Sequence, residues 1–153
     1  MVTEGQTYPL TVEGYASEGH GVARLDGQVV FVKGALVGEA CRATVEHVGH
    51  TAAWAHVAEL LTPSPARQAP DCPYYAQCGG CQTRHMTYQE ELRFKADKVR
   101  SALTRIGGVD PGQVPIHPAG DPERYRNKVQ FPVAPGPTLG YFQERTHKVI
   151  DVS

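Results

Sequence analysis

The sequence lacks any long uninterrupted run of apolar residues. No stretch approaches the roughly 18 consecutive apolar residues that mark a membrane-spanning helix. Its first ten residues contain neither the basic segment nor the apolar segment of a secretory signal. We therefore expect a cytoplasmic chain with no membrane attachment. In that reducing compartment, clustered cysteines indicate metal or redox chemistry rather than a disulfide framework.

Internal repeats, low-complexity tracts and a strong net charge are also missing. The 153 residues carry a net charge of −1, and 41% of them are hydrophobic, as in a soluble globular protein of one or two domains. The charge is unevenly distributed. Residues 1–63 hold three Lys/Arg against seven Asp/Glu, whereas residues 64–153 hold twelve against nine. Only the second part is mildly attractive to a polyanion.

The first sixty or so residues have the pattern of a small all-β domain. Short β-prone segments, separated by glycine-containing corners, are predicted at residues 6–15, 21–25, 28–32, 40–48 and 51–61. Asp26 and Gly27 between the second and third are a strong signal for a type I′ hairpin, because both central residues of that turn need a positive φ. Five such strands favour an OB-like barrel, a fold that can bind single-stranded nucleic acid.

A proline-rich segment follows the predicted barrel. Residues 62–70 contain three prolines and no hydrophobic periodicity, which indicates a stiff, extended linker. We predict a barrel domain at residues 1–62, a linker at 63–71 and a small α+β cysteine-cluster domain at 72–153. The expected fold class is mainly β with one long helix.

Three of the four cysteines fall within ten residues in a C-x5-C-x2-C pattern, as Cys72, Cys78 and Cys81. Thiolates are soft, anionic ligands suited to zinc and to iron–sulfur clusters. Gly79 and Gly80 let the backbone fold tightly enough to bring the last two onto one metal centre. Three thiolates are one ligand short of either kind of site. Cys41 lies in a predicted strand, where it is most simply a small buried apolar residue.

The clearest predicted helix follows the cysteines. Thr87 and Glu90 have the spacing of a capping box, and Gly107 with Gly108 marks the helix end. The apolar residues between them recur at helical spacing on one face, at Leu92, Ala96, Val99, Leu103 and Ile106.

From about residue 114 the chain returns to a strand pattern. Strands are predicted at residues 125–133, 138–143 and 147–152, in a meander. Arg126 and Lys128 lie two residues apart on the first of these, about 7 Å apart along an extended strand, which is close to the spacing of phosphates in a nucleic acid.

Taken together, these motifs resemble a known family. They are residues 19–24 (GHGVAR), Gly38 with Glu39, Ser64, Arg67, the cysteine run with Gln82 and His85, residues 125–128 (YRNK), and Gly140 and Tyr141 followed by His147. In this order they are similar to the amino-terminal part of the S-adenosylmethionine-dependent RNA uracil-C5 methyltransferases. The likeness is strongest to the iron–sulfur-containing branch that modifies 23S rRNA. The barrel then resembles a TRAM domain. Val37 departs from the family, which usually has proline there.

The resemblance implies a [4Fe–4S] cluster held by Cys72, Cys78 and Cys81, with a fourth cysteine expected just beyond Ser153. It also implies that the methyl-donor site, the nucleophilic cysteine and the general base of the parent enzyme lie outside this chain. No G-x-G-x-x-G loop is present. We therefore expect no catalytic residue here and no methyl transfer by the chain alone. In the parent, a thiolate adds to C6 of the uracil so that C5 can accept the methyl group, after the base leaves its stack.

The role that the resemblance leaves to this chain is to hold RNA, with 23S rRNA as the expected partner and a monomer as the expected state. Arg126 and Lys128 are the first candidates for phosphate contacts, and Arg84 and His85 are further candidates. Whether the barrel also contacts RNA stays open, because its acidic balance opposes it.

Two alternatives remain open. Cys72, Cys78, Cys81 and His85 form a complete Cys3His set, so the chain could be a zinc-stabilised RNA-binding module. It could also be a stand-alone RNA chaperone with no enzymatic parent.

Overall fold

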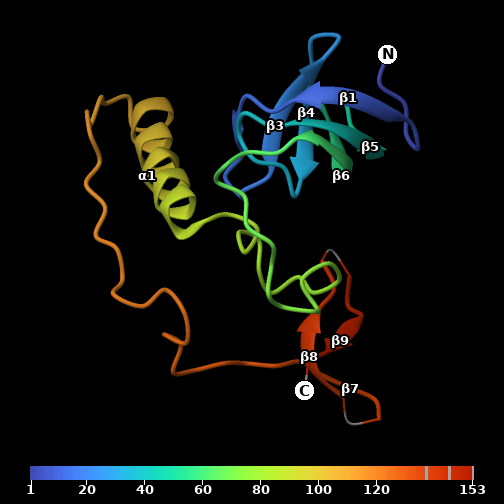
Figure 1. Cartoon of the computed structure of the whole chain (residues 1–153), viewed down its shortest axis with the longest axis vertical. Helices are drawn as coiled ribbons and strands as arrows, with labels where there is room; N and C mark the ends of the chain where they lie inside the picture. The colour runs from blue at the N-terminus through green and yellow to red at the C-terminus, as the bar shows by residue number, and fades with distance from the viewer. Residues whose placement is uncertain (137, 145, 153) are drawn as a thin grey trace.

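The computed structural model describes residues 1–136, 138–144 and 146–152. In them the chain forms a curled six-stranded sheet, one long helix and a small three-stranded sheet, joined by extended segments (Figure 1). The expected fold class, mainly β with one helix and an OB-like barrel domain, is confirmed. None of the described helices has the length and apolar character needed to cross a bilayer.

The strands of the large sheet fall where the sequence predicts them. The long first segment is split in two, and the others agree to within about one residue. They are β1 (Thr7–Thr11), β2 (Gly14–Tyr15), β3 (Gly21–Leu25), β4 (Gln28–Lys33), β5 (Ala40–Val48) and β6 (Ala52–Thr62). The hairpin between β3 and β4 turns at Asp26 and Gly27, with φ values of 51° and 82°. Both values are positive, as a type I′ turn requires.

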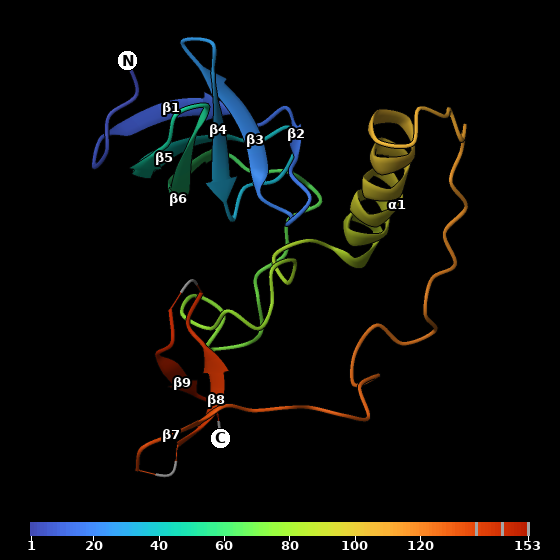
Figure 2. The same cartoon turned by 180° about the vertical axis from the view of Figure 1, so that it is seen from behind.

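The sheet has the strand order β1-β5-β6-β4-β3-β2, with β4 and β6 parallel and the other neighbours antiparallel. It curls until β1 approaches β3, so that it forms a half-barrel rather than a sheet fully closed by hydrogen bonds (Figure 2). Its interior is filled by small and β-branched side chains, including Val30, Val32, Ala43 and Ala53, each with an exposed fraction of 0%. Cys41 is among them, which confirms its interpretation as a core residue.

A second, smaller core joins the barrel to the segment after the cysteines. Leu36, Met86 and Phe94 are buried together, with Tyr15 and Ala66 packed against them. Phe94 lies in α1 (Tyr88–Arg105), so the first turns of the helix are anchored to the barrel through this cluster.

The capping box at the start of α1 is only half formed. The Thr87 hydroxyl accepts a hydrogen bond from Glu90 N, as predicted. The Glu90 carboxylate does not return to the Thr87 backbone. It accepts a hydrogen bond from the Tyr15 hydroxyl, while Thr87 N donates to the Ala66 carbonyl. Tertiary contacts therefore replace the second local hydrogen bond.

The apolar face predicted for α1 is mostly uncovered. Val99, Leu103 and Ile106 are exposed, Ile106 at 87%, whereas Glu90 and Phe94 are the buried residues of the helix. Beyond its first turns the helix stands clear of the barrel in both views (Figures 1 and 2). The spacing correctly predicted a helix, but these side chains meet no described partner.

The strand predicted at residues 125–133 was wrong except at its end. Residues 109–132 follow an extended, irregular path, and only β7 (Val133–Ala134) pairs with β8 (Thr138–Phe142). The other edge of β8 is taken by β9 (Val149–Asp151). A polar–apolar alternation forms a strand only where a neighbour supplies ladder hydrogen bonds. In the described residues no strand pairs with residues 125–131, although the Phe131 ring contacts Tyr141 of β8.

Candidate functional site

The cysteine segment is a compact loop built by its own backbone. Tyr75 N donates to the Cys72 carbonyl, and both Gln77 N and Cys78 N donate to the Tyr74 carbonyl. These hydrogen bonds fold the five residues between Cys72 and Cys78 into consecutive tight turns, so the segment is compact rather than extended.

The loop is docked against the end of β8. Gly79 N donates to the Phe142 carbonyl at 2.9 Å, and Cys78 forms an isolated bridge with Gln143. A Cβ on Gly79 would lie 2.7 Å from the Phe142 oxygen, so only glycine permits this approach. The loop is thereby held beside the β8–β9 hairpin, whose second strand leads toward residue 153.

The three thiols of the loop are free and interact electrostatically. Cys72 and Cys78 are half-buried, and Cys81 is exposed. Burial raises the pKa of the Cys81 thiol; Arg84 and Arg126 lower that pKa, and Cys78 and Cys72 raise it. Gly80 N also donates to Cys78 Sγ at 3.3 Å.

This donor set is chemically suited to a metal or an iron–sulfur cluster, because sulfur is a soft ligand that both kinds of site prefer. Its described conformation does not yet assemble a ligand cage. Among the residues that the structure describes, no group of three His, Cys, Asp or Glu side chains has metal-binding geometry. The cluster implied by the resemblance therefore stays a prediction.

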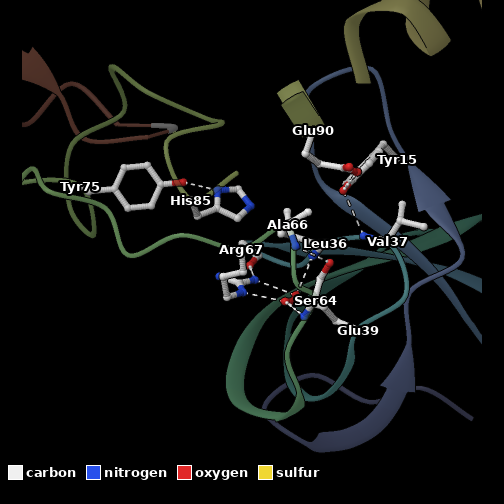
Figure 3. Close-up of polar contacts among 11 residues, drawn as sticks. Tyr15, Leu36, Val37, Glu39, Ser64, Ala66, Arg67, Tyr75, His85 and Glu90 are labelled. Atoms are coloured by element: carbon white, nitrogen blue, oxygen red, sulfur yellow. Dashed lines mark hydrogen bonds and ion pairs between the residues drawn. The ribbon is translucent and has the colours of Figure 1, made fainter. Parts of the chain in front are cut away.

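His85 lies behind the loop rather than among the thiols. It is 2% exposed, and its Nδ1 is 2.6 Å from the Tyr75 hydroxyl (Figure 3). Its Nε2 is buried without a hydrogen-bond partner in the described residues. Burial first, and then the charge of Arg67, lower the pKa of His85 to about 4, so the ring is neutral at physiological pH.

This position bears on two of the sequence-based hypotheses. A buried ring offers no surface to RNA. The Nδ1 of His85 faces Tyr75, and its charged neighbours are Arg67 and Glu39, which lie where the linker contacts the barrel; we call this contact the junction. We therefore assign His85 to that junction. The Cys3His zinc alternative loses its fourth ligand in this conformation.

The junction itself is centred on a buried carboxylate. Glu39 is 0% exposed and accepts hydrogen bonds from Leu36 N, Ser64 N and the Arg67 guanidinium, at 2.6 and 2.7 Å for the last (Figure 3). Arg67 also donates to the Gly34 carbonyl. Burial alone would raise the pKa of Glu39, but the hydrogen bonds from Arg67, Ser64 and Leu36 outweigh it and hold the pKa below its usual value. The pair fastens the linker to the barrel.

Tyr15 makes a second link across the junction. Its hydroxyl donates to Glu90 of α1 at 2.8 Å and accepts from Val37 N at 3.1 Å (Figure 3). Its ring lies edge-on to Phe94, with 5.5 Å between centroids. Sequence reasoning missed both Tyr15 and the role of Glu39. A lone carboxylate directly before a buried strand was the available signal for Glu39, since such a group needs a partner.

The residues predicted to contact RNA differ in whether their charge is already paired with a carboxylate. Arg84 forms a two-bond ion pair with Asp71 and lies 3.5 Å from Glu123. Arg126 and Lys128 are exposed, and within the described residues neither pairs with a carboxylate. The Arg126 guanidinium lies 5.8 Å from the ring centre of Tyr125 and interacts electrostatically with Cys81. Arg126 and Lys128 are thus exposed cations, Arg126 close enough to the cysteine loop to interact with Cys81, whereas Arg84 is largely neutralised.

Comparison with known proteins is consistent with this architecture. Residues 1–57 match the TRAM domain family. Over 99% of its length the chain is 36% identical to a protein of Clostridium tetani and 38% identical to one of Halalkalibacterium halodurans, both named uncharacterized RNA methyltransferases. The chain spans 34% of the length of each of these relatives.

A solved structure shares the fold. The crystal structure of Pyrococcus abyssi tRNA (uracil-54, C5)-methyltransferase in complex with S-adenosyl-L-homocysteine superimposes with a TM-score of 0.62 and 23% identity. The match covers 94% of this chain and 31% of that one. At this identity the likeness shows the fold alone.

Proposed function

We propose that this chain, with its TRAM domain and its similarity to RNA methyltransferases over 99% of its length, is the RNA-holding part of an RNA uracil-C5 methyltransferase. The observation that carries the proposal is the similarity of barrel, linker and cysteine domain together, rather than of the barrel alone. In this proposal S-adenosylmethionine and the catalytic residues belong to the rest of the parent enzyme, and 23S rRNA is the substrate.

The exposed cations Arg126 and Lys128 support RNA binding, and Arg126 lies close enough to the cysteine loop to interact with Cys81. Arg126 and Lys128 are exposed and unpaired by carboxylates among the described residues, so their charge is available to phosphates. The junction at Glu39 and Arg67 fastens the linker that leads to the cysteine loop, and thus limits how the two parts move relative to each other. A positioned pair of domains can hold a folded RNA while a base is presented to a catalytic site elsewhere.

We further propose that Cys72, Cys78 and Cys81 hold an iron–sulfur cluster, completed by a fourth cysteine just beyond Ser153. When bound, the cluster cross-links the cysteine loop to the chain beyond Ser153. It has no redox role here, because methyl transfer to uracil involves no net oxidation or reduction. The docking of Gly79 on Phe142 supports this role, since it brings the loop beside the hairpin that leads to that position.

Binding to an in vitro transcribed 23S rRNA fragment, measured by fluorescence anisotropy over a range of salt concentrations, tests the RNA proposal. Arg126→Ala and Lys128→Ala should each weaken binding and reduce the salt slope by about one, because each removes about one phosphate contact. Lys95→Ala is the matched control, since Lys95 already pairs with Glu91 at 2.7 Å on α1. Equal effects of all three would show only nonspecific attraction, and an absence of binding by the wild-type chain would refute the proposal.

Anaerobic reconstitution tests the cluster proposal. Iron and sulfide content should fall in Cys78→Ser and stay unchanged in Cys41→Ser, because Cys41 is buried in the barrel core. With only three thiolates in this chain, aerobic preparations should carry little iron. Stoichiometric zinc in place of iron would favour a zinc module instead.

A further inference from the structure

An aromatic row lies on the outer face of the barrel, outside the site described above. Phe31 of β4, Trp54 of β6 and His47 of β5 stand side by side across three adjacent strands. The ring centroids of Phe31 and Trp54 are 5.7 Å apart, and those of His47 and Trp54 are 5.5 Å apart in a stacked arrangement. We call these three residues the aromatic row.

The aromatic row is not part of the barrel core. The strand neighbours of Phe31 and Trp54 point inward and are fully or almost fully buried, at Val30, Val32, Ala53 and Ala55. Because side chains alternate along a strand, Phe31 and Trp54 face outward, where they remain half-exposed. A Cβ on Gly49 would lie 2.9 Å from the Trp54 ring, so glycine there lets the indole lie against the β5–β6 turn.

The cysteine domain forms the opposite wall of a cleft over this row. The cleft has a volume of about 180 Å³, and Phe31 and Trp54 face Gln77 of the cysteine loop and Gln143 at the end of β8 across it. Glu144 pairs with Lys33 of the barrel and lies 3.7 Å from His20, so ion pairs close one end of the cleft.

We propose that this cleft binds one unpaired nucleobase of single-stranded RNA, stacked on Trp54 and Phe31. The proposal rests on the proposed function, that the chain holds RNA, and assigns a second point of contact to it. Aromatic side chains on outer strands are the platform on which OB-like folds stack bases. The sequence left RNA contact by the barrel open because of its acidic balance, and this proposal assigns the barrel one base contact.

The polar groups that line the cleft suit the edge of a base. Glu144 lines it in an ion pair with Lys33, and Glu46 lines it with an oxygen 2.8 Å from His56 Nδ1; carboxylate oxygens can also accept hydrogen bonds from the N–H groups of a base edge. Gln77 and Gln143 can each donate and accept at the same edge. A base held here contacts both the barrel and the cysteine loop, and so bridges the two parts.

The fluorescence of Trp54 tests the proposal directly, because it is the only tryptophan of the chain. A short single-stranded oligouridylate is titrated into the full chain, with inorganic polyphosphate as a probe that carries charge but no base. We expect saturable quenching by the oligouridylate and none by polyphosphate. Phe31→Leu and Gln77→Ala should weaken oligouridylate binding, the first by about tenfold, the usual effect of losing one base stack.

Phe142→Leu is the matched control, since it removes an aromatic ring that is 41% exposed and lies outside the cleft. Circular dichroism confirms that each variant is folded. Binding without Trp54 quenching, or equal affinities for wild type and Phe31→Leu, would overturn the base site while leaving the proposed function intact. An absence of binding to both oligouridylate and the rRNA fragment would refute the two together.

Discussion

The barrel and the segment after α1 differ in how far their apolar side chains are buried. In the barrel, the inward residues of β1, β3, β4, β5 and β6 meet one another and are buried. After residue 105, apolar side chains such as Ile106, Tyr125 and Val133 are 87%, 69% and 68% exposed. The difference lies in partners rather than in composition. The sheet curls onto itself, whereas these side chains stay largely uncovered by the residues that the structure describes.

The largest expected effect contrasts two arginines that make the same kind of ion pair. Arg67→Met should lower the free energy of unfolding by about 3 kcal/mol, because it leaves the Glu39 carboxylate buried without its partner. Arg84→Met breaks an exposed pair with Asp71 and should change stability little. Urea denaturation of both variants measures the difference. Similar losses would show that burial does not distinguish the two ion pairs.

A pair of leucines gives the second contrast. Leu36→Ala should cost about 3 kcal/mol, since Leu36 is fully buried between barrel and helix and its truncation leaves a cavity. Leu103→Ala, on the exposed face of α1, should stay within about 0.5 kcal/mol. Thermal and urea unfolding report both. A large loss in Leu103→Ala would mean that the helix face is covered in solution, for example by a second copy.

The pH dependence of stability sharpens the role of the junction. The folded-state pKa of His85 is about 4, below the ordinary 6.5. Between these two pH values the unfolded chain binds a proton on His85 that the folded chain does not bind. Stability should therefore fall as pH drops below 6.5, by about 2 kcal/mol between pH 7 and pH 5. His85→Gln should flatten this slope, and the exposed His50→Gln should not. Parallel slopes in all three proteins would place the titration elsewhere.

The smallest effect concerns the helix cap. Thr87→Ala should cost about 1 kcal/mol, because it removes the oxygen that accepts from Glu90 N, whereas Thr87→Ser keeps that oxygen and should be nearly neutral. Helical content by circular dichroism and the unfolding free energy both measure it. If Ser and Ala behaved alike, the methyl packing of Thr87 rather than its hydroxyl would be the important contribution.

Local signals predicted the barrel strands well and the region after α1 poorly. The Asp26–Gly27 turn and the alternation along β3 and β4 act over neighbouring residues, so they survive without knowledge of the fold. The alternation at residues 125–133 was equally clear, but a strand needs an edge to pair with, and the described chain offers one only from Val133 onward. The same limit applies to α1, where the spacing predicted the helix but not that Phe94, rather than Val99 or Leu103, would be buried.

The candidate site shows the same division. The cysteine spacing and the glycines between Cys78 and Cys81 were visible in the sequence, as were Arg126 and Lys128. Which histidine is buried, which arginine is neutralised and which wall faces Trp54 depended on residues far apart in the chain. Asp71 forms an ion pair with Arg84, and Gln143 lines the cleft opposite Trp54 of β6.

By itself, the sequence determined the turns, the strands of the barrel, the helix and the supply of soft ligands, because each depends on the chemistry of residues a few positions apart. Only the tertiary structure decided that Glu39 and Arg67 fasten the linker, that His85 is withdrawn from solvent, and that Phe31 and Trp54 share a cleft with the cysteine loop. Burial and pairing are properties of surroundings, and those surroundings are assembled from segments that the chain brings together only when it folds.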